Sequence, residues 1–345
     1  MKELRFGRLL AGALITGVLV LGACDRGQER LYVYNWTYYV PDETIEAFER
    51  EFNVRVVYDT YASNEEMFAK LKAGGGGYDV VFPSGDYVSI MIAENMLMEI
   101  DRSKVPNYEN IDPAVLLLTT YDPGSRFSVP YVMGAAGIAI NANFVDDWEE
   151  SWSVFDRADL SGRITLLDDM REVLGAALRS LGYSVNTLDP VELEEAKTVV
   201  LGWRENIVRF DAETFGKGFA AGEFHVVHGY AENVFIEFED LDDSHVEFFI
   251  PAEGGPMYMD SMVILKGARN PDLAHTFIDF IHRPEVYAEI ADFLAIPPVN
   301  VPARELTTEQ PVYGFDALLN SEFIEDVGEG LTLYNRIWQE IRAGY

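Results

Sequence analysis

The 345-residue chain contains a single cysteine, Cys24. One cysteine cannot form an intrachain disulfide, so the fold must be held together by its hydrophobic core. The sequence has no internal repeat and no low-complexity linker. After its first 24 residues it also has no apolar run of the roughly 20 residues that a membrane-spanning helix requires.

Cationic side chains are scarce. The chain has 26 Lys and Arg against 58 Asp and Glu, which gives a formal net charge of −32. Such a surface favours solubility and says little about the fold. Its sign disfavours nucleic acids and anionic ligands and favours a cationic ligand. A disordered acidic tail is excluded, because 48% of the residues are hydrophobic and 13% are aromatic.

The first 23 residues have the pattern of a secretory signal peptide. Lys2, Arg5 and Arg8 precede a nearly continuous apolar run over residues 9–21. That run is too short to span a bilayer comfortably, and a basic start before a short apolar stretch is typical of a signal. We therefore expect residues 1–23 to be a signal peptide.

The cysteine follows this run directly, in the order Leu21-Gly22-Ala23-Cys24. This order resembles the lipobox of bacterial lipoproteins, which implies that Cys24 becomes a lipidated N-terminus. Residues 24–30 are then a lipid-anchored tether. Asp25 resembles the signal that retains some lipoproteins at the inner membrane. The alternative is an ordinary signal peptide followed by a buried cysteine.

Short apolar strands alternate with amphipathic helices along the rest of the chain, which predicts an α/β fold with parallel strands. Strands are expected at 31–35, 54–58, 78–83, 135–141, 164–167, near 226–227, and at 260–265. Helices are expected at 41–52, 64–71, 173–181, 193–208, 272–281, 286–293 and 331–341.

Two such series predict two lobes. We expect an N-terminal lobe of residues 31–134 and 262–310, and a C-terminal lobe of residues 135–261 and 311–345. The connections are strands near 135–141 and 260–265 rather than a flexible linker. This arrangement predicts a hinge with a ligand cleft between the lobes.

Aromatic and acidic residues follow the predicted strands, where such a cleft would open. The candidates are Trp36, Thr37, Tyr39, Ser84, Asp86, Asp169, Glu172, Tyr230, Asn233, Tyr258 and Asp260. Aromatic walls suit methylene chains, and carboxylates suit ammonium groups, so this set favours an extended di- or polyamine. The five histidines are scattered without metal-ligand spacing, and we expect no metal or cofactor.

The mature sequence resembles the periplasmic spermidine/putrescine-binding proteins of bacterial ABC importers. The resemblance rests on YNWTYYVP at 34–41, YDVVFPS at 78–84, EGGPMYMDS at 253–261 and DVGEG at 326–330, among other segments. It implies a two-lobed, type II periplasmic binding protein that closes on its ligand and is not an enzyme. The implied setting is the periplasm, where a monomer delivers a polyamine to a membrane permease and its ATPase.

The same resemblance implies roles for particular residues. Contacts in the first loop and after the third strand are implied for Trp36, Thr37, Tyr39 and Ser84. Amine-binding acids are implied at Asp169, Glu172 and Asp260. Asp169 and Glu172 could instead be acids favoured at a helix N-terminus, and Asp86 could be a surface residue.

Several positions depart from the family. Tyr38 replaces a frequent acid, Asp86 stands where spermidine binders have Tyr, and Tyr230 and Tyr258 stand where Trp is frequent. Ile296 and Ile324 replace polar contacts, a Tyr and a Gln. These changes leave the length of the ligand open and slightly favour putrescine over spermidine.

Three functions other than polyamine capture are alternatives for this sequence. The acid pairs could indicate a glycosidase, but no nucleophile elbow or Ser-His-Asp pattern supports an enzyme. Tyr38 and Tyr39 could ligate ferric iron on the same scaffold. A receptor that senses polyamines without transport is also compatible with the sequence.

Overall fold

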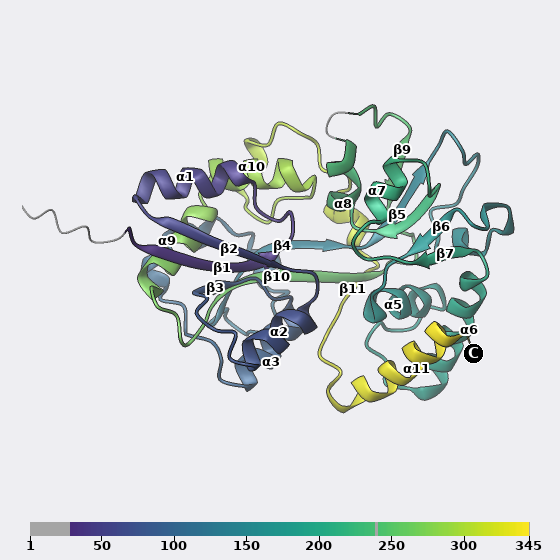
Figure 1. The fold of residues 1–345 in the computed structure, drawn as a ribbon, viewed down its shortest axis with the longest axis horizontal. Coiled ribbons are helices and arrows are strands. Elements are labelled where there is room, and N and C mark those ends of the chain that lie inside the picture. The colour runs from purple at the N-terminus through teal and green to yellow at the C-terminus, as the bar shows by residue number, and fades with distance from the viewer. Residues whose placement is uncertain (1–27, 239–240, 345) are drawn as a thin grey trace, which may run out of the picture.

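The computed structural model describes residues 28–238 and 241–344, so the predicted signal peptide, Cys24 and most of the tether lie outside the described residues. Two mixed β-sheets, each flanked by helices, form two lobes (Figure 1). This is the two-lobed α/β architecture expected of a type II binding protein. Among the described helices, none combines the length and apolar character needed to cross a membrane.

The first sheet has the strand order β11-β10-β3-β1-β2, and β4 also pairs with β10. Its strands are β1 (Arg30–Trp36), β2 (Arg55–Tyr61), β3 (Val80–Val81), β4 (Ser128–Ala135), β10 (Pro256–Ile264) and β11 (Glu322–Phe323). β1 runs parallel to β2 and β3, whereas β10 runs antiparallel to β3 and β4. The prediction of parallel strands is therefore wrong for β10, because the chain leaves this lobe along β4 and returns beside it in the opposite direction.

Helices cover both faces of this sheet. They are α1 (Asp42–Phe52), α2 (Asn64–Lys72), α3 (Gly85–Ala93), α4 (Pro113–Leu116), α9 (Pro271–Ile281) and α10 (Pro284–Leu294). Successive residues of a strand point to opposite faces of its sheet, so alternate residues of β1 pack against the helices on opposite faces. Leu31 and Val33 join the cluster that contains α1, α9 and α10, whereas Tyr34 joins the cluster that contains α2 and α3.

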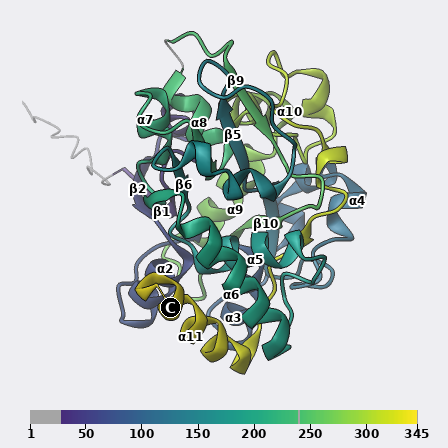
Figure 2. The same cartoon turned by 90° about the vertical axis from the view of Figure 1, so that its right-hand side faces the viewer.

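The second sheet has the order β7-β6-β8-β5-β9. Its strands are β5 (Gly137–Asn141), β6 (Ile164–Leu166), β7 (Ile207–Phe210), β8 (Val226–Gly229) and β9 (Val246–Phe249). Its helices are α5 (Met170–Ser180), α6 (Pro190–Arg204), α7 (Phe215–Ala220), α8 (Ala231–Phe235) and α11 (Leu331–Ala343). In Figure 2, α5, α6 and α11 gather on one side of this lobe and α7 and α8 on the other.

Two details of this lobe bear on the predictions. The helix expected over 193–208 ends at Arg204, because Ile207 begins β7 and pairs with Ile164 of β6. The C-terminal helix docks as expected, since Tyr334, Ile337, Trp338 and Ile341 are buried in the second hydrophobic cluster.

The connection between the lobes is short. β4 ends at Ala135 and β5 begins at Gly137, so one residue separates the two sheets along this path. Two glycines of this connection lie very close to neighbouring atoms. A Cβ atom at Gly137 would lie 2.5 Å from the Phe249 carbonyl oxygen. A Cβ atom at Gly134 would lie 2.6 Å from the Tyr258 hydroxyl. Glycine is needed at both positions because of this close approach.

Candidate functional site

A cavity of about 1230 Å³ is lined by residues of both lobes. All eleven residues predicted from the sequence lie in its wall: Trp36, Thr37, Tyr39, Ser84, Asp86, Asp169, Glu172, Tyr230, Asn233, Tyr258 and Asp260. The structure therefore brings the whole predicted set together in one cleft. None of the residues in this set lies elsewhere in the described structure.

Asp260 is the most tightly held acid of the cleft. It lies on β10, is 3% exposed, and accepts hydrogen bonds from the Tyr39 hydroxyl and the Ser84 hydroxyl, each at 2.6 Å. Burial raises the pKa of Asp260 to about 6, although both hydroxyl hydrogen bonds favour the ionised form. A buried carboxylate with two fixed donors is well placed to receive a cation on its remaining lone pairs.

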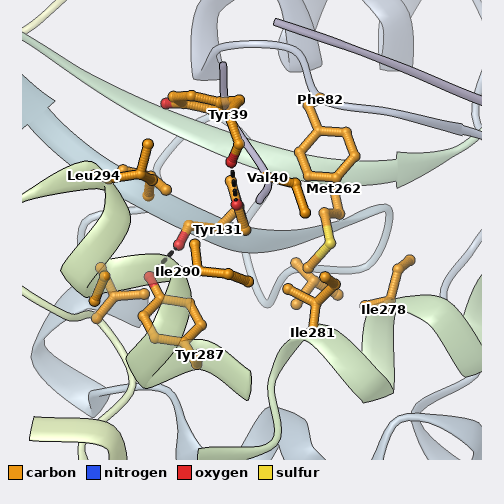
Figure 3. Close-up of a cluster of buried hydrophobic side chains, with 14 of the residues drawn as sticks. Tyr39, Val40, Phe82, Tyr131, Met262, Ile278, Ile281, Tyr287, Ile290 and Leu294 are labelled. Atoms are coloured by element: carbon orange, nitrogen blue, oxygen red, sulfur yellow. Dashed lines mark hydrogen bonds between the residues drawn. The ribbon is translucent and has the colours of Figure 1, made fainter. Parts of the chain in front are cut away.

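The loop after β1 is anchored to the core of the first lobe. Tyr131 donates its hydroxyl to the Tyr39 carbonyl oxygen at 2.6 Å, and Tyr287 donates to the Tyr131 carbonyl oxygen (Figure 3). Tyr38 has a left-handed φ of 56° and is 55% exposed, which is uncommon for a residue with a side chain. This turn leaves Thr37 and Tyr38 exposed at the cavity while Tyr39 returns to the interior.

Trp36 forms part of the aromatic wall. Its indole N–H donates to the Phe82 carbonyl oxygen at 2.9 Å, and the Tyr61 hydroxyl donates to the same oxygen at 2.6 Å. The Trp36 and Tyr61 ring centroids lie 4.7 Å apart. The segment after β3 therefore fixes the orientation of a half-buried indole whose remaining surface faces the cavity.

Asp169 and Glu172 lie at the start of α5 and differ in their roles there. Asp169 is the N-cap, and its carboxylate accepts hydrogen bonds from the backbone N–H groups of Arg171 and Glu172 at 2.8 and 3.0 Å. The capping role considered from the sequence is thus present, although Asp169 also lines the cavity. Glu172 is 3% exposed and accepts a 3.2 Å hydrogen bond from the Tyr230 hydroxyl. Burial, and then the neighbouring charge of Asp169, raise the pKa of Glu172 well above its usual range.

Asp86 lies in the first turn of α3, a helix that the sequence prediction missed. Its side chain is partly buried in the cavity wall, so it is not a surface residue. Burial raises the pKa of Asp86 to about 7, although the positive charge of Arg171 lowers this pKa. Asn233 lines the same cavity from α8.

Among the acids of the cleft that the sequence prediction missed, Glu232 has a raised pKa. Glu232 lies on α8, lines the cavity, and accepts a 3.2 Å hydrogen bond from the Tyr258 hydroxyl. Burial is the main cause that raises the pKa of Glu232 to about 7. It lies between Tyr230 and Asn233, which were selected because they follow β8, and the same criterion would have selected it.

One predicted departure from the family does not reach the site. Ile324 lines the cavity, but Ile296 is 3% exposed and belongs to the hydrophobic core of the first lobe. Ile296 therefore offers no polar group to the cavity. The slight preference for putrescine over spermidine stays a prediction.

The charge of the cavity is strongly negative. Twelve Asp and Glu line it, against two cationic residues, Arg171 and Lys217. The Arg171 guanidinium already has hydrogen-bond partners, because it donates to the Asn186 side chain at 2.6 Å and to the Glu325 carbonyl oxygen at 2.9 Å. Within the described residues, no group of three or more His, Cys, Asp or Glu is arranged to hold a metal ion. The cleft is thus suited to an organic cation with apolar segments.

Residues 43–310 match the family described as bacterial extracellular solute-binding protein. The chain belongs to this family. It is 36% identical to the spermidine/putrescine-binding periplasmic protein of Escherichia coli (strain K12), over 100% of both chains. It is 35% identical to the putrescine/cadaverine-binding protein of Pseudomonas aeruginosa, over 78% of this chain and 79% of the relative.

Solved structures of solute-binding proteins agree with this assignment. The TpPotD lipoprotein of Treponema pallidum is 46% identical and superposes with a TM-score of 0.87, covering 91% of this chain and 99% of its own. The resemblance and the fold class inferred from the sequence are therefore confirmed. A solute-binding protein carries its ligand without chemical change, so the enzyme alternative is excluded.

Proposed function

We propose that this solute-binding protein captures linear polyamines of the putrescine and spermidine class and delivers them to the permease and ATPase of an ABC importer. The observation that carries the proposal is the buried Asp260 carboxylate, fixed by Tyr39 and Ser84 inside an aromatic, strongly acidic cleft. An ammonium group at this carboxylate offsets the cost of burying its charge. The relatives from Escherichia coli and Pseudomonas aeruginosa, which bind spermidine, putrescine or cadaverine, support the same ligand class.

The aromatic residues have a separate role in this proposal. Trp36 comes from the first lobe and Tyr230 from the second, and both line the cavity. Faces of such rings pack on methylene groups and attract ammonium groups, typically by about 0.5–2 kcal/mol for each cation–π contact. Ligand contacts at all eleven predicted residues are part of the proposal.

We propose further that the two lobes close on the ligand. We take residues 31–134 with 262–310, and residues 135–261 with 311–345, as the moving units, except that β10 and β11 pair within the first sheet and move with it. The short crossing between β4 and β5 supports a hinge there, because few residues have to change conformation. A small cation that contacts both walls would favour the closed form.

Calorimetric titration and solution scattering on the same samples test this function. We expect putrescine or spermidine to bind at a single site, and the saturated protein to have a smaller radius of gyration than the free protein. Arginine and glutamate serve as controls, because neither offers ammonium groups at the two ends of an alkyl chain. The absence of heat with putrescine, cadaverine, spermidine and spermine alike would refute polyamine capture. Binding with unchanged scattering would refute closure alone.

We also propose that the mature protein is a monomer held at the periplasmic face of the inner membrane by a lipid on Cys24. The similar protein TpPotD of Treponema pallidum is a lipoprotein, which supports a lipid anchor here. We expect the wild-type chain to fractionate with membranes when produced in a bacterium, and Cys24→Ser to appear in the soluble periplasmic fraction. Membrane retention of Cys24→Ser would argue against the anchor.

A further inference from the structure

Two tyrosine–glutamate pairs lie next to each other in the cleft wall. Tyr230 donates its hydroxyl to Glu172 Oε1, and Tyr258 donates its hydroxyl to Glu232 Oε1, both at 3.2 Å. The two tyrosine rings are in edge-to-face contact, with centroids 5.6 Å apart. Each glutamate thus has a tyrosine hydroxyl as hydrogen-bond donor, one at the start of α5 and the other on α8.

The second oxygen of each glutamate is buried without a hydrogen bond. Among the described residues, neither Glu172 Oε2 nor Glu232 Oε2 has a hydrogen-bond partner. A buried carboxylate oxygen without a donor is costly when the group is ionised. A proton removes this cost in the free protein, and an ammonium group of a ligand removes it in the complex.

The surroundings of Glu232 contain no cation that already neutralises it. Of the ion pairs formed by residues 28–238 and 241–344, none involves Glu232. The titratable groups that act on Glu232 are Asp260, through its charge, and Tyr258, through its hydrogen bond. In turn, the charge of Glu232 raises the pKa of the tyrosines at positions 39, 230, 258 and 313. Burial and the charge of Asp260 raise the pKa of Glu232 to about 7. The residue is therefore poised to lose a proton when a cation arrives.

We propose that Glu232 is an ammonium-binding residue that makes the cleft discriminate ligands by their number of charges. This inference rests on the proposed function. Asp260, Glu172 and Glu232 each accept a hydrogen bond from a tyrosine hydroxyl, and none of them forms an ion pair within the described residues. A diamine has two ammonium groups and leaves one of these three carboxyls without an ammonium partner, whereas a triamine can neutralise all three. Glu232 then contributes mainly to the affinity for the triamine.

The test compares Glu232→Gln with Glu213→Gln. Glutamine keeps the size of the side chain and an oxygen that accepts from Tyr258, but it removes the charge. Glu213 also lines the cavity, but its side chain is exposed, so Glu213→Gln makes the same charge change outside the buried pair. Affinities for putrescine and spermidine are measured by calorimetry at about pH 8, above the pKa of about 7 of Glu232.

We expect Glu232→Gln to weaken spermidine binding by about tenfold or more and putrescine binding by less than about threefold. Glu213→Gln should change both affinities by less than about threefold. Equal losses for the two ligands, or no loss for either, would overturn the role of Glu232 while leaving polyamine capture intact. A wild-type protein that binds neither ligand would instead overturn the proposed function.

A second variant, Tyr258→Phe, tests the same role should Glu232→Gln fail to fold. Tyr258→Phe removes only the hydroxyl that orients Glu232, and the aromatic wall remains. We expect it to lower the spermidine-to-putrescine affinity ratio in the same direction as Glu232→Gln. A ratio equal to that of the wild type in this variant would show that the Tyr258–Glu232 pair does not set the discrimination.

Discussion

Asp260→Asn is expected to abolish tight polyamine binding, with a loss of about 3–5 kcal/mol, which corresponds to a factor of roughly 150 to 4,000 in Kd. Asparagine keeps one oxygen that accepts from Tyr39 or from Ser84, but its amide group cannot accept the second hydrogen bond and carries no charge. It cannot neutralise a buried ammonium group, so the ligand would carry an uncompensated charge in the cleft. The measurement is calorimetric titration with putrescine and with spermidine.

Asp168→Asn is the matched control for this variant. Asp168 also lines the cavity, but it is ion-paired with Arg342 at 3.0 Å and its side chain is 33% exposed. We expect its replacement to change Kd by less than about threefold, because an exposed carboxylate is screened by water. If Asp260→Asn kept an affinity within this range, Asp260 would not be the central ammonium site.

Binding should also depend steeply on pH. Burial raises the pKa of Asp260 to about 6 and those of Asp86 and Glu232 to about 7 in the free protein. A bound ammonium group favours the ionised carboxylates, so binding releases protons wherever these groups are still protonated. Between about pH 8 and about pH 5 we expect the affinity to fall by a factor of about 100 or more, because each unit below a coupled pKa costs about 1.4 kcal/mol.

Stability provides the control for this pH dependence, because it should change in the opposite direction without ligand. In the free protein the pKa values of these carboxyls are higher in the folded than in the unfolded state. The folded state therefore binds more protons, and these groups lower the free energy of unfolding as the pH rises from about 4 to about 7. Thermal melts with and without spermidine should diverge with increasing pH. An affinity independent of pH over this range would show that the three carboxyls are not coupled to the ligand.

The sequence located the cleft well because strand ends are easy to place. β1, β3, β6 and β8 each follow an apolar pattern, and residues at or just after the end of each strand line the cleft, whereas Tyr258 and Asp260 lie within β10. Trp36 and Asp169 were found in this way without knowledge of their contacts. The same reasoning reached Tyr230, yet it passed over Glu232, whose significance depends on the Tyr258 hydroxyl donated from β10.

Two errors in the predicted helices have physical causes. α3 was missed because Gly85 opens it and its mixed apolar pattern resembles a loop beside a strand end. Ile207 and Val208 continue the apolar pattern of α6 but leave it to pair with β6, and this choice depends on a tertiary partner.

The direction of β1 has a consequence for delivery at the membrane. β1 begins at Arg30, and its opposite end, Trp36, lies at the cleft about 20 Å away at roughly 3.3 Å per residue. The described chain therefore enters the first sheet at the end remote from the cleft (Figure 1). An attachment upstream of Arg30, such as the proposed lipid on Cys24, would hold the molecule at this remote end and leave both walls of the cleft free to move. Lengthening the segment before Arg30 should therefore leave the affinity for the ligand unchanged.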